Sequence, residues 1–158
     1  MNSNVKLNFV LDLDGIFTDG SFYYSVDGKI MKKFGAHDSD GIKMIKDKIK
    51  ILVITADKKG FEISRKRMND LQLELKYVDE YNRYDFCQKF GMNNLIYMGD
   101  GFYDSEILKN CFFGITTPNA VNDCKENADY ITSRLGGNGA VFEACKIVKE
   151  KFLWKISL

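Results

Sequence analysis

The chain has 158 residues, of which 45% are hydrophobic and 28% charged, a composition typical of a globular domain. Its net charge of +1 argues against a general nucleic-acid-binding protein. No apolar run reaches the roughly 18 residues that a membrane-spanning helix needs, and the first residues lack the pattern of a secretion signal. We therefore expect a single domain over 1–158 that lies in the cytoplasm and has neither nucleic acid nor membrane as a partner.

Short apolar strands alternate with amphipathic helical patterns along most of the chain. After a first strand at 7–13, aromatic residues on both sides of Asp27-Gly28 predict a β-hairpin within 17–34. Further strands are predicted at 50–55, 73–78, 94–99, 111–116 and 128–132. Helices are predicted at 41–47 with Asp38 as the N-cap, and at 61–71, 84–90, 104–109, 120–126 and 139–152. This alternation predicts an α/β fold with a Rossmann-like, doubly wound parallel sheet.

Acidic and hydroxyl residues follow three of the predicted strands. Asp12 and Asp14 close the first strand, Thr55 ends the second, and Asp100 follows a later one with Asp104 four residues on. Because the carboxyl ends of parallel strands meet at one edge of a sheet, we expect these side chains to lie together. Oxygen ligands without neighbouring histidine or cysteine favour Mg²⁺ over zinc. The alternative is that each residue is an independent turn former or helix cap.

Three segments resemble motifs of the haloacid dehalogenase (HAD) superfamily of phosphotransferases. These segments are DLDGIFTDG at 12–20, ILVIT at 51–55 and GDGFYD at 99–104. The spacing, with DSDGIKM at 38–44, TPNA at 117–120 and GGNGAVFE at 136–143, is similar to that of a capless branch of the superfamily. That branch contains the phosphatases of 3-deoxy-manno-octulosonate 8-phosphate and of nine-carbon keto-sugar-acid 9-phosphates. The resemblance runs from about residue 7 to residue 151.

The resemblance implies a Mg²⁺-dependent phosphatase that acts on a phosphorylated keto sugar acid through an aspartyl-phosphate. It assigns Asp12 as the nucleophile and Asp14 as the general acid and base. Thr55 would hold the phosphoryl group. Asp12, Asp100 and the backbone carbonyl of Asp14 would hold the metal, with Asp104 as a supporting acid.

The third motif departs from the family pattern, which usually has Asp-Lys at this place. The matching stretch is Asn-Arg-Tyr at 82–84, so Arg83 is the predicted phosphate-binding cation and Lys76 the second choice. The alternative for Arg83 is a solvated position in the first turn of a helix.

Other residues bear on the choice of substrate. The stretch after Thr55 is Ala56-Asp57, and an acid at 57 resembles the nine-carbon enzymes more than the octulosonate enzymes. Thr18, Ala56 and Asp57 are therefore counted as supporting or substrate-binding residues. Phe142 stands where the branch often has arginine, which removes one possible anion-binding group.

The hairpin, placed at about 17–36, is too short to form a separate cap domain. In the resembled branch such hairpins assemble tetramers, so we expect a homotetramer formed through this flap; the alternative is a hairpin folded onto its own sheet. A Gly-rich segment and a helix at about 134–152 complete the predicted domain. Two other functions stay open: an inactive domain serving oligomerisation or regulation in sialic-acid-type sugar activation, and a phosphatase for another small metabolite.

Overall fold

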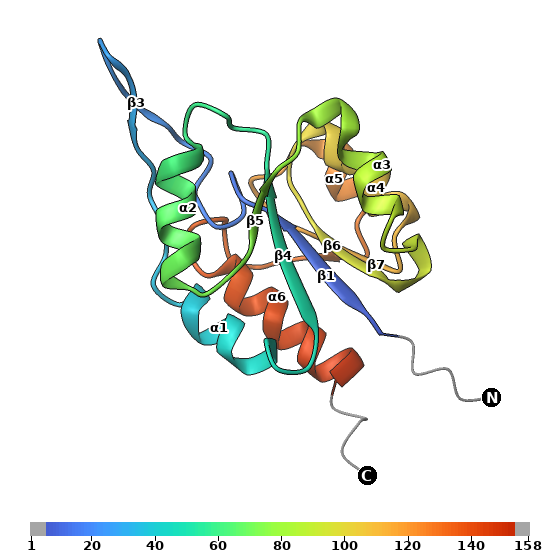
Figure 1. Cartoon of the computed structure of the whole chain (residues 1–158). Helices are drawn as coiled ribbons and strands as arrows, with labels where there is room; N and C mark the ends of the chain where they lie inside the picture. The colour runs from blue at the N-terminus through green and yellow to red at the C-terminus, as the bar shows by residue number, and fades with distance from the viewer. Residues whose placement is uncertain (1–5, 154–158) are drawn as a thin grey trace, which may run out of the picture.

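All six strands of the main sheet run parallel, in the order β5-β4-β1-β6-β7-β8 (Figure 1). The computed structural model describes residues 6–153, so both ends of the predicted domain, 1–5 and 154–158, lie outside the described residues. The strands are β1 (Asn8–Asp12), β4 (Lys50–Thr55), β5 (Leu75–Tyr77), β6 (Leu95–Met98), β7 (Phe113–Thr116) and β8 (Tyr130–Ile131).

Helices cover both faces of this sheet (Figure 1). On one face lie α1 (Asp38–Ile45), α2 (Phe61–Asp70) and α6 (Ala140–Val148), and on the other α3 (Arg83–Gln88), α4 (Ser105–Asn110) and α5 (Asn122–Asn127). In β1, Phe9 and Leu11 pack in the first core and Val10 in the second. This double burial explains why β1 is almost continuously apolar. The predicted doubly wound α/β fold is confirmed.

Strand β1 lies at the point where the order of the strands reverses. The chain adds β4 and β5 on one side of β1 and then crosses over to add β6, β7 and β8 on the other. In open parallel sheets such a reversal leaves a crevice beyond the carboxyl ends of the strands. The residues that follow β1, β4 and β6 are therefore placed around one crevice.

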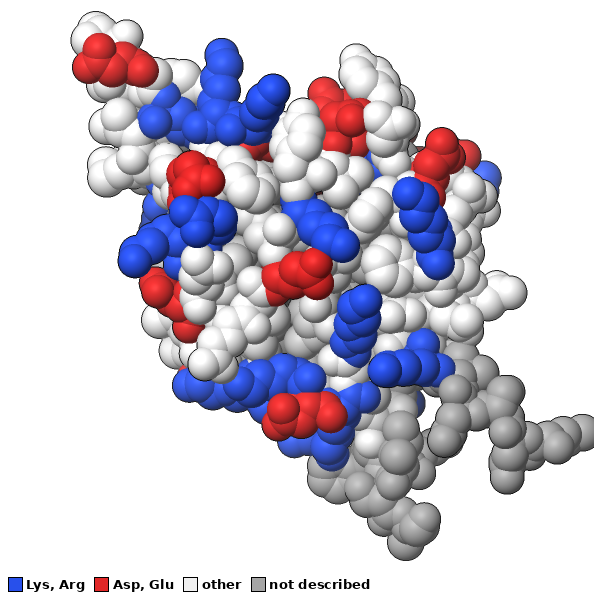
Figure 2. Space-filling view, in the orientation of Figure 1, with Lys and Arg blue, Asp and Glu red and all other residues white. Residues whose placement is uncertain are grey.

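The predicted hairpin is formed by β2 (Tyr23–Ser25) and β3 (Gly28–Met31), which pair antiparallel outside the main sheet. It projects from the body of the molecule (Figure 1), and a bridge between Thr18 and Phe34 closes its base. Several large apolar side chains on the hairpin are exposed: Phe22, Tyr23, Tyr24, Val26, Ile30 and Met31. Figure 2 shows acidic and basic side chains interspersed over the face of the body in view.

Some helix boundaries differ from the prediction. Helix α1 begins at Asp38 itself, whose carboxylate is buried and caps no backbone N–H. Short 3-10 turns precede two helices: η1 (Glu80–Asn82) lies before α3, and η3 (Phe102–Asp104) before α4. Asp79 accepts hydrogen bonds from the N–H groups of Tyr81 and Asn82, which starts the first of these turns and makes Arg83 the first residue of α3.

Two further turns complete the chain that the structure describes. A 3-10 turn, η2 (Met92–Asn94), precedes β6, and a π turn, η4 (Lys149–Leu153), continues the last helix. Among the described residues, no helix combines the length and the apolar character that crossing a bilayer requires.

Candidate active site

Three strands deliver the predicted site residues to one edge of the sheet. Asp12 is the last residue of β1, Thr55 is the last residue of β4, and Asp100 follows β6 by two residues. A pocket of about 320 Å³ opens at this edge. Its lining includes six of the predicted residues: Asp12, Asp14, Ala56, Arg83, Asp100 and Asp104.

Three carboxylates form the centre of the pocket. Asp12, Asp100 and Asp104 each offer one oxygen, and these oxygens lie within 4.8 Å of one another. Gly15 has a positive φ of 85°, and a Cβ at that position would lie 1.9 Å from Asp100 Oδ2. Glycine is therefore needed after the first strand, both for the turn and for the close approach of Asp100.

Asp104 is fully buried, and both of its oxygens are occupied by protein groups. Its Oδ1 accepts hydrogen bonds from Arg83 Nη1 at 2.7 Å and from the Tyr97 hydroxyl at 2.5 Å. Its Oδ2 accepts from the backbone N–H groups of Asp100 and Gly101, at 3.1 and 2.9 Å. Asp104 therefore orients the loop that carries Asp100, and leaves Asp12 and Asp100 as the more available metal ligands.

Arg83 lies beside the predicted nucleophile. Its Nη1 is 3.2 Å from Asp12 Oδ1, its Nε has no hydrogen-bond partner, and only 5% of the residue is exposed. Burial lowers the pKa of Arg83, but the charge of Asp12 and the neighbouring Tyr97 and Asp104 raise it more. The guanidinium is thus a permanent buried cation at the place where the sequence predicts one, and not a solvated helix residue.

The carboxylates carry more negative charge than Arg83 balances. Burial is the main cause that raises the pKa of Asp12 well above its usual value; Arg83 lowers it, and the nearby acids raise it again. Burial and the charge of Asp104 raise the pKa of Asp100 to about 7. Crowded carboxylates with raised pKa values are the donor set that a divalent cation stabilises, so these residues fit Mg²⁺.

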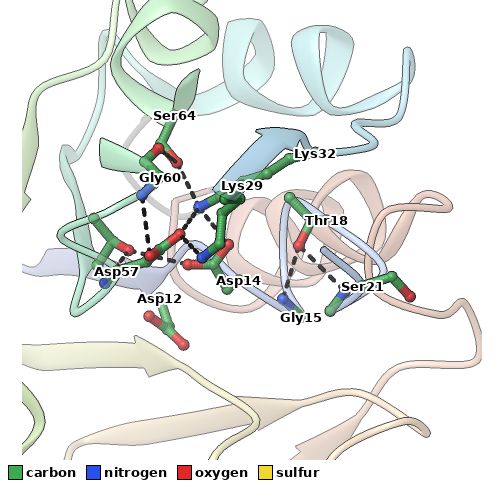
Figure 3. Close-up of polar contacts among 12 residues, drawn as sticks. Asp12, Asp14, Gly15, Thr18, Ser21, Lys29, Lys32, Asp57, Gly60 and Ser64 are labelled. Carbon is green, nitrogen blue, oxygen red and sulfur yellow. Dashed lines mark hydrogen bonds and ion pairs between the residues drawn. The ribbon is translucent and has the colours of Figure 1, made fainter. Parts of the chain in front are cut away.

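Asp14 lies on the other side of Asp12, toward the hairpin (Figure 3). Its Oδ2 accepts a hydrogen bond from the Thr55 hydroxyl at 3.0 Å, and its Oδ1 accepts one from Lys32 Nζ at 2.7 Å. The Thr55 hydroxyl also accepts from the N–H of Asp57 at 3.1 Å. Both predicted residues therefore reach the pocket edge, but the lysine that holds Asp14 is absent from the prediction.

Besides Thr55, which is buried behind Asp14, three predicted residues do not line the pocket. The Asp57 carboxylate is ion-paired with Lys29 and Lys32, so it is not free to bind a substrate. Thr18 is buried, and its hydroxyl accepts from the N–H groups of Gly15 and Gly20, which shapes the loop after β1.

The third residue, Lys76, is excluded from the site by the strand order. It lies on edge strand β5, separated from β1 by β4. Its ammonium is 3.3 Å from Glu74, and it lines a separate open hollow of about 720 Å³ beside α3. This larger hollow lacks the carboxylate cluster, so we assign the chemistry to the smaller pocket. Lys76 therefore lies outside the smaller pocket, whereas Arg83 lies inside it beside Asp12.

Sequence reasoning also missed residues that border the pocket. Tyr97 lies in the middle of β6, where its ring looks like any other core residue. Phe102 and Tyr103 are exposed at the pocket mouth with their rings 5.4 Å apart, and Tyr81 lies 5.4 Å from Tyr103. Phe102 and Tyr103 lie between the two acids of GDGFYD, and this position in the motif could have indicated that they border the pocket.

Comparison with known proteins gives the following relatives. No family model matches the chain. It is 28% identical over 152 residues to the 3-deoxy-D-manno-octulosonate 8-phosphate phosphatase KdsC of Haemophilus influenzae, covering 92% of this chain and 83% of the relative. Two solved structures each have a TM-score of 0.81, 27% identity and 92% coverage of this chain. One, covered to 87%, is the same phosphatase from Moraxella catarrhalis in complex with magnesium, phosphate and KDO. The other, covered to 83%, is a Legionella pneumophila protein named as a HAD superfamily (subfamily III A) hydrolase.

The parallel sheet, the acids at its carboxyl edge and these relatives show that the chain is similar to phosphatases of the haloacid dehalogenase type. In particular, the chain is similar to the 3-deoxy-D-manno-octulosonate 8-phosphate phosphatases over nine-tenths of its length. The similar Moraxella protein is in complex with magnesium, and the carboxylate cluster found here has the oxygen ligands that such an ion needs, in agreement with the predicted Mg²⁺ cofactor.

Proposed function

We propose that the chain is a cytoplasmic, single-domain, Mg²⁺-dependent phosphatase of a phosphorylated keto sugar acid, of the octulosonate 8-phosphate or nonulosonate 9-phosphate type. The observation that carries the proposal is the buried pair of Asp12 and Arg83, with Asp100 beside it, at the carboxyl end of the central strand. The similar Moraxella enzyme binds magnesium, phosphate and KDO, which supports this substrate class.

In the proposed reaction, an oxygen of Asp12 attacks phosphorus, and the bond between phosphorus and the sugar oxygen breaks. Asp14 gives its proton to the departing alkoxide, and an aspartyl-phosphate forms on Asp12. Asp14 then takes a proton from water, the water oxygen attacks phosphorus, and the Asp12 carboxylate and inorganic phosphate are released. Asp12, Asp100 and the carbonyl of Asp14 would hold a Mg²⁺ ion, which would neutralise charge on the phosphate when bound.

Arg83 and Thr55 have supporting roles in this reaction. The Arg83 guanidinium lies within 3.2 Å of Asp12, so it can keep the nucleophile ionised and bind an oxygen of the phosphate next to it. The Thr55 hydroxyl is bound to Asp14 and can turn to donate to a phosphate oxygen, because a hydroxyl is both donor and acceptor. Phe102 and Tyr103 offer apolar ring faces at the pocket mouth, against which a sugar can pack.

We also propose a homotetramer assembled through the hairpin. The support is the exposed apolar surface of β2 and β3, since a two-stranded hairpin is marginally stable unless something packs against it. Sedimentation velocity at micromolar concentration tests the assembly. A tetramer is expected, and a monomer would contradict the proposal.

Phosphate release tests the proposed function. The purified protein is incubated with and without Mg²⁺ on a panel of eight- and nine-carbon keto-sugar-acid phosphates and common hexose phosphates. We expect metal-dependent release that is selective for one sugar acid. Selective release from a hexose phosphate would overturn the substrate class. No release from any ester by folded protein with Mg²⁺ would overturn the enzyme and favour a domain for assembly or regulation.

A further inference from the structure

Lys32 places a fully buried ammonium group against the proposed acid and base. Lys32 directly follows β3 of the hairpin, and none of its side chain is exposed to solvent. Its Nζ donates hydrogen bonds to Asp14 Oδ1 at 2.7 Å and to the Ser64 hydroxyl at 2.8 Å, and lies 2.8 Å from Asp57 Oδ2. Figure 3 shows these groups converging from the hairpin, β1 and α2. An ammonium group has three donors, so each contact accounts for one of them.

The surroundings of Lys32 form a closed cluster with balanced charge. Lys29 also pairs with Asp57 Oδ2, so two lysines face two carboxylates. The Phe22 ring covers the pair, with Lys29 Nζ 3.4 Å from the ring centroid. Burial raises the pKa of Asp57, but the bonds with Lys29 and Lys32 more than offset this and lower it overall. Asp57 is therefore held as a carboxylate by the two lysines.

Gly60 fixes how closely the lysines approach. A Cβ at this position would lie 2.1 Å from Asp57 Oδ2 and 2.7 Å from Lys32 Cε. The Asp57 Oδ1 atom accepts from the N–H of Gly60 at 3.1 Å, and the Ser64 hydroxyl donates to the carbonyl of Gly60 at 3.2 Å. The absence of a side chain at Gly60 thus leaves room for the lysine side chains at the start of α2. The contacts of Lys32 therefore depend on a specific local structure and are not a chance surface contact.

We propose that Lys32 is a positioning residue for Asp14, held in place by Asp57 and Ser64; this inference rests on the proposed phosphatase function. Lys32 fixes Oδ1 of Asp14, so Oδ2 is the oxygen that transfers the proton. The Oδ2 partner is the single hydroxyl of Thr55, which can reorient when substrate binds. Proton transfer requires heavy atoms within about 2.6–3.2 Å of each other, so holding one oxygen of the Asp14 carboxyl group keeps the other oxygen in place to give or take the proton. The hairpin therefore contributes a residue to the chemistry of its own chain.

The test compares two esters that differ in their need for an acid. Nitrophenolate leaves phosphorus without a proton, whereas a sugar alkoxide must be protonated. We would measure kcat/KM, which reports the step that forms the aspartyl-phosphate, for 4-nitrophenyl phosphate and for the best sugar-acid phosphate of the panel. The variant is Lys32→Met, which keeps the length of the stem and removes the ammonium group. The matched control is Lys33→Met, the adjacent exposed lysine.

We expect Lys32→Met to lower kcat/KM for the sugar ester by about 10–100-fold, part of the 10²–10⁴-fold that acid catalysis supplies. The value for 4-nitrophenyl phosphate should change less than about threefold, because that ester needs no acid. Lys33→Met should change neither. Equal losses on both esters, or no loss on either, would overturn the positioning role.

Stability and function are separated by two further measurements. Lys32→Met leaves two partly buried carboxylates with one lysine, so folding is checked by circular dichroism and thermal unfolding. If that variant does not fold, Lys32→Met/Asp57→Asn replaces it, since this pair of changes removes one charge of each sign. The same dependence on the ester is expected. Wild-type protein that hydrolyses neither ester would overturn the proposed function itself, whereas an active wild type with a uniform loss in the variant overturns only the role of Lys32.

Discussion

Two clusters of charged side chains flank Asp12, and they differ in how far the charges of their acids are balanced by cations. On one side, three carboxylates crowd around a single guanidinium, and the pKa values of Asp12 and Asp100 are raised. On the other side, two lysines face Asp14 and Asp57, and the pKa of Asp57 is lowered. The first cluster has more negative than positive charge, so a metal ion can bind there and can in turn bind a phosphate. In the second cluster, two lysines balance the charge of two carboxylates without a ligand. The comparison separates residues proposed to bind the metal ion and phosphate from residues proposed to position the catalytic groups.

The largest expected effect is that of Asp12→Asn. The substitution removes the nucleophile, and we expect phosphate release to fall by at least about a thousandfold. Because it also removes one of the crowded carboxylates, thermal stability should be equal or higher. Asp40→Asn, at an exposed acid on α1, is the control and should behave as the wild type. Substantial activity in Asp12→Asn would show that the nucleophile is misassigned.

Arg83→Met tests the only cation within the first cluster. The guanidinium pairs with both Asp12 and Asp104, so we expect about a 10²–10³-fold loss of kcat, as for other groups that stabilise developing charge. Removing one partner of a buried ion pair also costs about 3–5 kcal/mol of stability, measurable by urea unfolding. Arg83→Lys should recover part of both losses, because lysine keeps the charge but not the second N–H group. Full activity of Arg83→Met would refute the assigned role.

Magnesium should stabilise the protein through the first cluster alone. At a concentration of one hundred times its Kd, an ion that binds only the folded state adds about 2.7 kcal/mol. For a chain of this size, that corresponds to an increase in Tm of about 5–10 °C. Differential scanning fluorimetry with and without Mg²⁺ measures the shift. It should be largely lost in Asp100→Asn and kept in Asp57→Asn, whose carboxylate is already paired. Equal loss in both variants would contradict the division between the clusters.

The first cluster was accessible from sequence because each of its acids sits at a fixed offset from an apolar strand. Parallel strands end at one edge, so offsets along the chain become proximity in space. The second cluster was not accessible, because Lys32 and Asp14 are 18 residues apart on segments with no common period. The hairpin pattern predicts that a turn forms, but not which of its lysines folds back onto the sheet.

The difference between position in the sequence and position in the fold also explains why Lys76 lies outside the pocket and why Tyr97 was not predicted. Lys76 precedes the right motif in sequence, but it lies on an edge strand, and the order of strands in the sheet decides which residues meet. Tyr97 occupies an interior strand position that any large core residue could fill, so only its contact with Asp104 reveals its role.

Asp38 shows that buried negative charge alone does not make a site. It lies at the start of α1 with 2% of its surface exposed, and neither carboxylate oxygen makes a well-formed hydrogen bond within the described chain. Burial raises its pKa to about 7, although the backbone of Phe142 and the charge of Arg67 partly oppose this. Among residues 6–153, no carboxylate is found to raise the pKa of Asp38, in contrast to the first cluster. A single acid can take up a proton, whereas the crowded acids need a metal ion.

The smallest predicted effect follows from this difference. The pKa of Asp38 is about 7 in the folded chain and about 3.9 in the unfolded chain. The folded state therefore binds the proton more tightly, and stability falls as the pH rises from about 4 to about 7. Asp38→Asn cannot ionise, so it should gain about 1–3 kcal/mol over the wild type between pH 5 and pH 6 in urea unfolding. The contributions of Asp12 and Asp100 are common to both proteins and cancel. A gain that is independent of pH would mean that the carboxylate stays ionised in the fold, and that a charge of the surrounding helices compensates for its burial.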